Sequence, residues 1–85
     1  MANVEIYSSQ LCGYCHAAKR LLNEKGVDFH EIPVDMDVEA RATMRNRAGG
    51  RNSVPQIFID GQHVGGCDEL YSLENQGELD ALLAG

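Results

Sequence analysis

Apolar and polar residues along the first half of the chain follow the periods of a strand, a helix and a second strand. Val4–Tyr7 alternates as strands do, and the apolar residues within His16–Lys25 fall on one helical face. Gly26 is placed to end this helix in the left-handed conformation. Phe29–Val34 predicts a strand parallel to the first because a helix separates the two, and its Pro33 places it at a sheet edge.

A second helix is predicted over Val38–Ala48, with Asp35 or Asp37 as its N-terminal cap. Its apolar positions are few, so we expect only modest packing against the rest of the fold. The side of this helix that faces solvent is expected to be basic, and its arginines are Arg41, Arg45 and Arg47.

The second half of the chain predicts a hairpin followed by two helices. Gln56–Asp60 gives the clearest strand, Asp60-Gly61 is a hairpin turn signal, and Gln62–Val64 is a short return strand near an edge. One helix opens at Cys67, and a last short one follows the break at Asn75–Gly77. The whole pattern predicts an α/β fold with a four-stranded mixed sheet flanked by helices on both faces, as a single domain formed by all 85 residues.

Composition and charge narrow the class of protein. Hydrophobic residues make up 44% of the chain, which is enough for a modest core, and the net charge is −6. Nucleic-acid-binding proteins usually show a basic face, which this acidic chain does not predict. No apolar run has the length of a membrane span, and the first residues lack the basic and apolar stretches of a signal peptide. We therefore expect a cytoplasmic protein without nucleic-acid or membrane partners, in which a cysteine pair is more often catalytic or metal-binding than a permanent disulfide.

Cys12-Gly13-Tyr14-Cys15 lies where the first strand ends and the first helix begins. A C-x-x-C at that place in a βαβ pattern indicates a thiol–disulfide redox site. The first N–H groups of a helix are unpaired and carry the positive end of its dipole, so a thiolate is stabilised there. Cys12 is nearer the loop and is expected to be exposed, so it is predicted to attack a disulfide. Cys15 lies a turn further in and is predicted to resolve the resulting mixed disulfide.

Two other interpretations of these cysteines remain open. With His16 the motif also matches C-x-x-C-H, the attachment pattern of c-type haem, although no export signal is visible. The strand–helix setting fits redox chemistry better than haem attachment. A zinc site would need four ligands, for which Cys12, Cys15, Cys67 and one histidine could be assembled, but the sequence has no second C-x-x-C or H-x-x-H pair.

Three markers together resemble a glutaredoxin, over nearly the whole chain. They are the C-x-x-C after the first strand, Ser53-Val54-Pro55 before the third strand, and Gly65-Gly66-Cys67-Asp68 before the third helix. The pattern is most similar to that of small bacterial dithiol glutaredoxins. The resemblance implies a thioredoxin-like fold, a cis peptide bond before Pro55, and glutathione as the reductant.

The resemblance also implies roles for single residues. Cys12 would take up the glutathionyl group as the nucleophile, and Cys15 would resolve protein disulfides. Tyr14 would lie against glutathione, and the backbone of Val54, next to Pro55, would pair with its cysteinyl part as an added strand does. The γ-glutamyl end would be held at the start of the third helix by Gly66, Cys67 and Asp68.

The chain departs from the family pattern at three positions. Gly13 stands where relatives usually have proline, Ser9 where they often have lysine, and Asn52 where many carry a basic residue. The glycyl carboxylate of glutathione then needs another cation, for which Arg51 is the first candidate and the arginines of the second helix are weaker ones. We expect the loss of the lysine and of the basic residue to weaken glutathione binding or to make the Cys12 thiolate less stable.

The main function hypothesis is a monomeric glutathione-dependent oxidoreductase that reduces protein disulfides and protein–glutathione mixed disulfides, with ribonucleotide reductase as a family expectation for a partner. A second hypothesis is a 2Fe–2S carrier, in which two chains bridge one cluster through Cys12 of each and two glutathione sulfurs. Gly13 favours it, because proline there would stiffen the loop. A third is a thioredoxin-like electron donor reduced by a flavoenzyme, against which the Gly66-Cys67-Asp68 segment favours glutathione.

Overall fold

The central strands of the sheet are its most buried ones, because helices cover both of their faces. In the computed structural model, which describes residues 2–85, β1 (Val4–Ser8) and β3 (Gln56–Ile59) pair antiparallel at this centre. β2 (His30–Pro33) pairs parallel with β1 at one edge, and β4 (Gln62–Gly65) pairs antiparallel with β3 at the other. The mixed sheet and the edge position of the proline-bearing strand are both as predicted.

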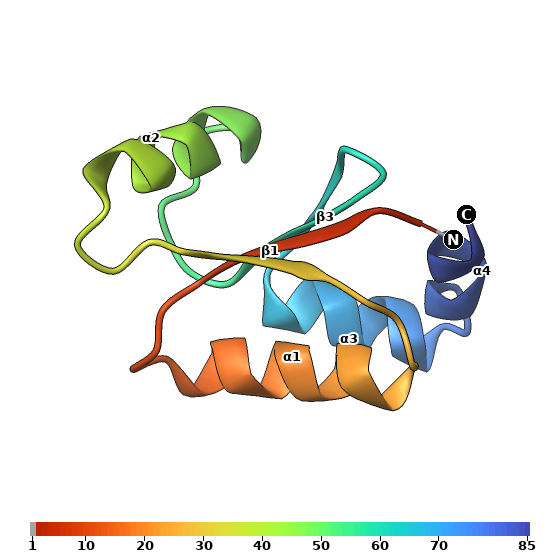
Figure 1. The fold of residues 1–85 in the computed structure, drawn as a ribbon. Coiled ribbons are helices and arrows are strands. Elements are labelled where there is room, and N and C mark those ends of the chain that lie inside the picture. The colour runs from red at the N-terminus through yellow and green to blue at the C-terminus, as the bar shows by residue number, and fades with distance from the viewer. Residues whose placement is uncertain (1) are drawn as a thin grey trace.

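Helices lie on both sides of this sheet within the described residues. α1 (Gly13–Glu24) and α3 (Cys67–Asn75) cover one face and α2 (Val38–Arg47) covers the other (Figure 1). α4 (Leu79–Ala84) lies beside the first described residues, and the Ala2 N–H donates to the Leu83 carbonyl at 3.2 Å. Among residues 2–85, no helix has both the length and the apolar character needed to cross a bilayer.

The larger part of the core lies between the sheet and the layer formed by α1 and α3. The burial of each large apolar side chain there contributes about 1.5–3 kcal/mol. A smaller cluster lies on the other face, where Met44 of α2 packs with Tyr7 and Phe58, whose rings meet edge-on with centroids 5.8 Å apart. The larger core includes these fully buried side chains: Ile6, Ala18, Leu22, Ile57, Leu70 and Leu79.

The expectation that all three arginines of α2 face solvent is wrong for Arg47. Its Nη1 lies 2.8 Å from Glu5 Oε2, and its guanidinium carbon lies 4.1 Å from the centroid of the Phe58 ring. A helix with few apolar residues thus covers an aromatic surface with a guanidinium, which interacts favourably with the ring face and carries an apolar stem. Arg41 and Arg45 instead donate to Asn52, whose carbonyl lies 2.7 Å from Arg41 Nη1.

The apolar pattern does not reveal where two of the helices begin. α1 begins at Gly13, earlier than the apolar period predicts, with Cys12 as its N-cap in extended conformation. α2 is capped by Asp37, which accepts from the Ala40 N–H at 3.0 Å. Asp35, the other predicted cap, reaches instead to the loop between β1 and α1. At the far end of α1, Gly26 has φ of 71°, as predicted for a left-handed cap.

Candidate active site

Cys12 stands at the first turn of α1, next to the turn that leads into β3. Its backbone is extended, and its Sγ lies 3.6 Å from the carbonyl oxygen of Val54. The side chain is partly exposed. A sulfur at this place faces the unpaired N–H groups of the helix and can be reached from solvent.

Cys15, one turn into the same helix, is fully buried. Its sulfur accepts from the Ser9 N–H at 3.4 Å. Burial raises the pKa of the Cys15 thiol to about 11. The Cys12 sulfur is therefore accessible, whereas the Cys15 sulfur is shielded and protonated at neutral pH. The sequence predicts the same difference in exposure between the two cysteines.

A groove of about 260 Å³ runs beside Cys12, between the segment before β3 and the start of α3. The Val54–Pro55 peptide bond at its floor is cis, as the resemblance implies. The Val54 N–H makes no hydrogen bond among residues 2–85, so it is free to pair with a ligand. The groove brings together every residue predicted to contact glutathione: Tyr14, Arg51, Val54, Pro55, Gly66, Cys67 and Asp68.

Glu69 joins the two walls of this groove, and sequence reasoning missed it. Its Oε1 accepts from the Gly66 N–H at 2.6 Å and from Arg51 Nη2 at 3.3 Å. The Gly66 N–H, followed by the charge of Arg51, lowers the pKa of the Glu69 carboxyl. The signal was present in the chain, because Glu69 is the third residue of α3, a position from which a glutamate side chain accepts from the backbone N–H of the N-cap residue, here Gly66.

Arg51 is the arginine that lines the groove among those considered for the glycyl carboxylate. Its side chain is 45% exposed, so the Nη atoms can turn toward a ligand. Arg47 is held under α2 by Glu5, and Arg45 donates to Asn52. The weaker candidates of the second helix therefore lie outside the groove lining.

Cys67 opens α3 and forms part of the groove wall. It is buried, and this burial, followed by the charge of Asp68, raises the pKa of its thiol. A protonated, shielded thiol is a packing residue rather than a nucleophile at neutral pH.

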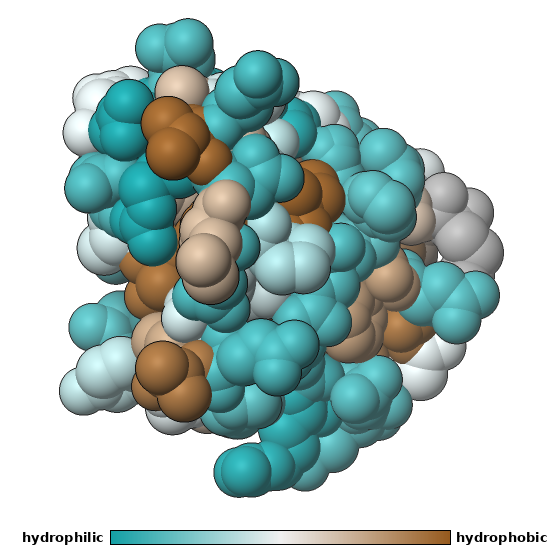
Figure 2. Space-filling view, turned by 60° about the vertical axis from the view of Figure 1, so that its left-hand side comes forward, coloured by the Kyte–Doolittle hydropathy of each residue, from teal (hydrophilic) through white to brown (hydrophobic). Residues whose placement is uncertain are grey.

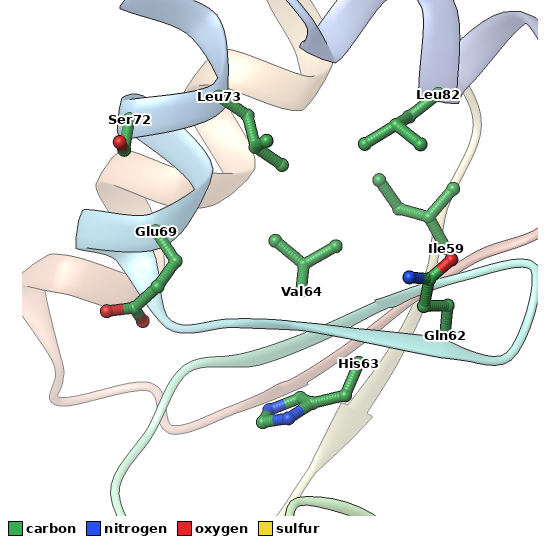
Figure 3. A pocket seen from close by; sticks show the side chains of 8 residues that line it. All are labelled: Ile59, Gln62, His63, Val64, Glu69, Ser72, Leu73 and Leu82. Carbon is green, nitrogen blue, oxygen red and sulfur yellow. The ribbon is translucent and has the colours of Figure 1, made fainter.

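A second hollow, of about 340 Å³, lies between β4, α3 and α4 (Figure 3). The side chains of Val64, Leu73 and Leu82 point into it, whereas the His63 ring lies on the other side of β4. His63 is occupied there by a 2.6 Å contact from its Nε2 to Gln56 Oε1. This hollow is larger than the groove, but its lining contains no cysteine. It therefore does not lie beside Cys12.

Comparisons with known proteins agree with this geometry. The glutaredoxin family matches residues 4–64. Glutaredoxin 3 of Escherichia coli K12 is 58% identical over 83 residues, which cover 98% of this chain and 99% of that protein. The solution structure of glutaredoxin from Brucella melitensis superposes with a TM-score of 0.85 at 53% identity, covering 98% of this chain and 89% of the other. A buckwheat glutaredoxin–glutathione complex superposes with a TM-score of 0.88 at 29% identity, covering 98% and 77%. The chain belongs to the glutaredoxin family, whose members are glutathione-dependent thiol–disulfide oxidoreductases with a thioredoxin-like fold.

Proposed function

We propose that Cys12 is the nucleophile and Cys15 the resolving thiol of an oxidoreductase that reduces protein–glutathione mixed disulfides and protein disulfides. The observation that carries this assignment is the contrast between the two sulfurs. Cys12 is partly exposed at the N-terminus of α1, with its Sγ 3.6 Å from Val54 O, and Cys15 is fully buried. A nucleophile must be reachable by its substrate, and Cys12 meets this condition better than Cys15 does.

The groove supplies donors and acceptors that match glutathione. The free N–H and the carbonyl of Val54 can pair with the cysteinyl part of the tripeptide in the manner of an added strand. The start of α3 and Asp68 suit the carboxylate and ammonium of the γ-glutamyl end, because a helix N-terminus attracts anions. Arg51 suits the glycyl carboxylate and Tyr14 lies along the groove. The structure of a buckwheat relative in complex with glutathione supports glutathione as the ligand.

With a glutathionylated protein, the Cys12 thiolate attacks the glutathione sulfur. The substrate's disulfide breaks, the protein thiolate leaves and takes up a proton, and Cys12 is left joined to glutathione. The thiolate of a second glutathione attacks the sulfur of the bound glutathione, so glutathione disulfide leaves and the Cys12 thiolate returns. With an intramolecular protein disulfide, the Cys12 thiolate first attacks one sulfur of the substrate, so that the substrate disulfide breaks and a Cys12–substrate mixed disulfide forms. Cys15 then loses its proton and attacks Cys12 Sγ, which releases the second substrate thiolate and forms the Cys12–Cys15 disulfide. Two glutathiones reduce that disulfide in two further exchanges and leave as glutathione disulfide.

A turnover assay on a small glutathionyl mixed disulfide tests these roles. Replacing Cys12 by Ser is expected to reduce the rate to the uncatalysed background, because the attacking sulfur is gone. Replacing Cys15 by Ser is expected to spare deglutathionylation and abolish the reduction of intramolecular protein disulfides. Loss of deglutathionylation in Cys15→Ser, in a variant that melts normally, contradicts the division of roles.

A second candidate function, cluster binding by a dimer, is favoured by one observation at Gly13. This residue is the first of α1, and a Cβ placed on it meets nothing within 4 Å, so proline would fit there but glycine is present. No three His, Cys, Asp or Glu side chains within residues 2–85 gather as one metal site, so one chain alone does not supply a full ligand set. Cys12 would supply one thiolate from each chain, with glutathione sulfurs as the others.

Anaerobic purification with glutathione tests this second function. A coloured dimer that becomes colourless and monomeric in Gly13→Pro is the expected result. A colourless monomer from the unaltered chain under the same conditions contradicts it.

A further inference from the structure

We infer that Leu11, Met36 and Val38 form a docking ridge for the polypeptide segment that carries the target cysteine, and that the ridge favours segments with apolar and basic side chains. This inference rests on the proposed role of Cys12 as the sulfur that is attacked. It adds a protein-recognition surface to the groove that is proposed to hold glutathione.

The three ridge side chains are large, apolar and exposed to solvent. Leu11 is 97% exposed, Met36 103% and Val38 80%. Figure 2 turns the end of the molecule with α2 and the β1–α1 loop toward the viewer, and it shows brown apolar residues at the surface among teal polar ones. Apolar side chains that gather at the surface of a small domain mark an interaction site, and here Met36 and Val38 lie two residues apart in the chain while Leu11 comes from the neighbouring loop.

The ridge is held in place by hydrogen bonds between two loops. Asp35, at the end of β2, accepts from Ser9 Oγ at 2.7 Å and from the Gln10 N–H at 2.8 Å. These bonds join the residues that directly precede Met36 and Leu11. The two apolar tips are therefore presented at a fixed separation rather than on independent loops.

Met36 has a backbone conformation that a residue with a side chain rarely adopts. Its φ is 57°, in the left-handed region, and the side chain makes no compensating burial. Such outliers tend to persist where the side chain they present has a use. Glycine would relieve the strain but would also remove the apolar tip.

Sheet topology places the ridge on the opposite side of Cys12 from the groove. The strand order is β2-β1-β3-β4, so the end of β1 that leads to Cys12 lies between the end of β2 and the start of β3. The groove is on the β3 side and the ridge is on the β2 side. When glutathione fills the groove, the β2 side of Cys12 is the side left for the polypeptide joined to that glutathione, and the ridge lies on this side.

The charges around the ridge indicate the chemistry of the partner segment. Asp37 and Glu39 flank Val38 and are exposed, and Glu39 forms no ion pair among residues 2–85. Acidic groups beside apolar ones attract basic side chains, and this attraction weakens as salt rises. The fitting partner is therefore an exposed segment with apolar and basic residues next to its cysteine.

Glutathionylated peptides of equal length test the ridge. One carries leucine and lysine beside its cysteine and the other carries serine and glutamate, while the mixed disulfide of glutathione and 2-mercaptoethanol reports the chemistry alone. The unaltered chain is expected to prefer the leucine–lysine peptide by about threefold to tenfold in kcat/KM at low salt, the range of modest contact energies. This preference is expected to fall at high salt.

The double variant Leu11→Ser with Met36→Gly is expected to lose most of the preference and to keep its rate on the small disulfide. Met36→Gly alone is expected to melt no lower than the unaltered chain, because glycine accepts a positive φ, and Leu82→Ser serves as an exposed apolar control far from Cys12. Equal rates on both peptides in the unaltered chain, or an unchanged preference in the double variant, overturn the ridge. Failure of the unaltered chain on the small disulfide instead overturns the role of Cys12.

Discussion

The groove beside Cys12 and the hollow behind α3 share Glu69 in their linings but differ in chemistry. The groove, at about 260 Å³, is lined by free backbone groups, an arginine and the start of a helix, and it lies beside an accessible sulfur. The hollow, at about 340 Å³, is lined half by aliphatic and half by polar residues, and its lining contains no cysteine. Volume therefore does not distinguish the candidate active site from the hollow. The groove is distinguished by an accessible sulfur that lies next to unpaired polar groups.

The sharpest test of this difference is a truncation in the hollow. Leu73 is partly buried against the main core, so Leu73→Ala is expected to reduce the free energy of unfolding by about 1–2 kcal/mol. Thermal melting is expected to shift downward by about 4–8 °C per kcal/mol for a domain of this size. Turnover per folded molecule is expected to stay unchanged, and a large fall in kcat would show that the hollow takes part in the chemistry.

The matching truncation in the groove is Arg51→Ala. The side chain is half-exposed and paired only with Glu69 among the described residues, so little stability depends on it. We expect KM for glutathione to rise about threefold to tenfold, since a charge-assisted contact to a carboxylate is lost. Arg45→Ala, which removes a contact to Asn52 outside the groove, is the control, and an equal rise of KM in that variant argues against a specific site at Arg51.

Gly13→Pro changes the residue between Cys12 and Tyr14, of which Tyr14 lines the groove. The first position of a helix accepts proline, and a Cβ at Gly13 meets nothing within 4 Å. We expect the free energy of unfolding to rise by about 0.4–1 kcal/mol, because the unfolded chain loses conformational freedom. Denaturant unfolding measures the change, and a fall in stability would show that the loop needs glycine for its backbone conformation.

The smallest expected effect concerns Glu69, which belongs to both regions. Its folded-state pKa is lowered, so its contribution to stability is present above the ordinary value of 4.5 and is lost as pH falls below it. Glu69→Gln keeps a capping oxygen but removes the charge, so the variant is expected to lose a small part of the acid dependence of stability. Glu31 and Asp35, whose pKa values are also lowered, account for other parts of it. Identical acid dependence in both proteins contradicts the role of the carboxylate.

The strands, the helices and the thiol pair could be predicted from the sequence because each depends on neighbours along the chain. The C-x-x-C between a strand and a helix indicates an accessible first sulfur and a shielded second one, and the structure has this arrangement. The groove could not be derived in this way, since it joins Val54, Arg51 and Asp68 across the fold, and only the resemblance brought these residues together. The partners of polar side chains were the least predictable: Arg47 turns inward to Phe58, and Asp35 bonds to a neighbouring loop instead of capping α2.

The complete burial of Cys15 affects how the two cysteines are expected to react with peroxide. An oxidant that diffuses in from solvent meets Cys12 first and converts it to the sulfenic acid. Cys15, whose thiol is hydrogen-bonded to that of Cys12, is then expected to condense with that acid, releasing water, before a second peroxide oxidises Cys12 to the irreversible sulfinic state. Because burial shields Cys15 from oxidants in solvent, its thiol is expected to stay reduced and able to react with an oxidised Cys12.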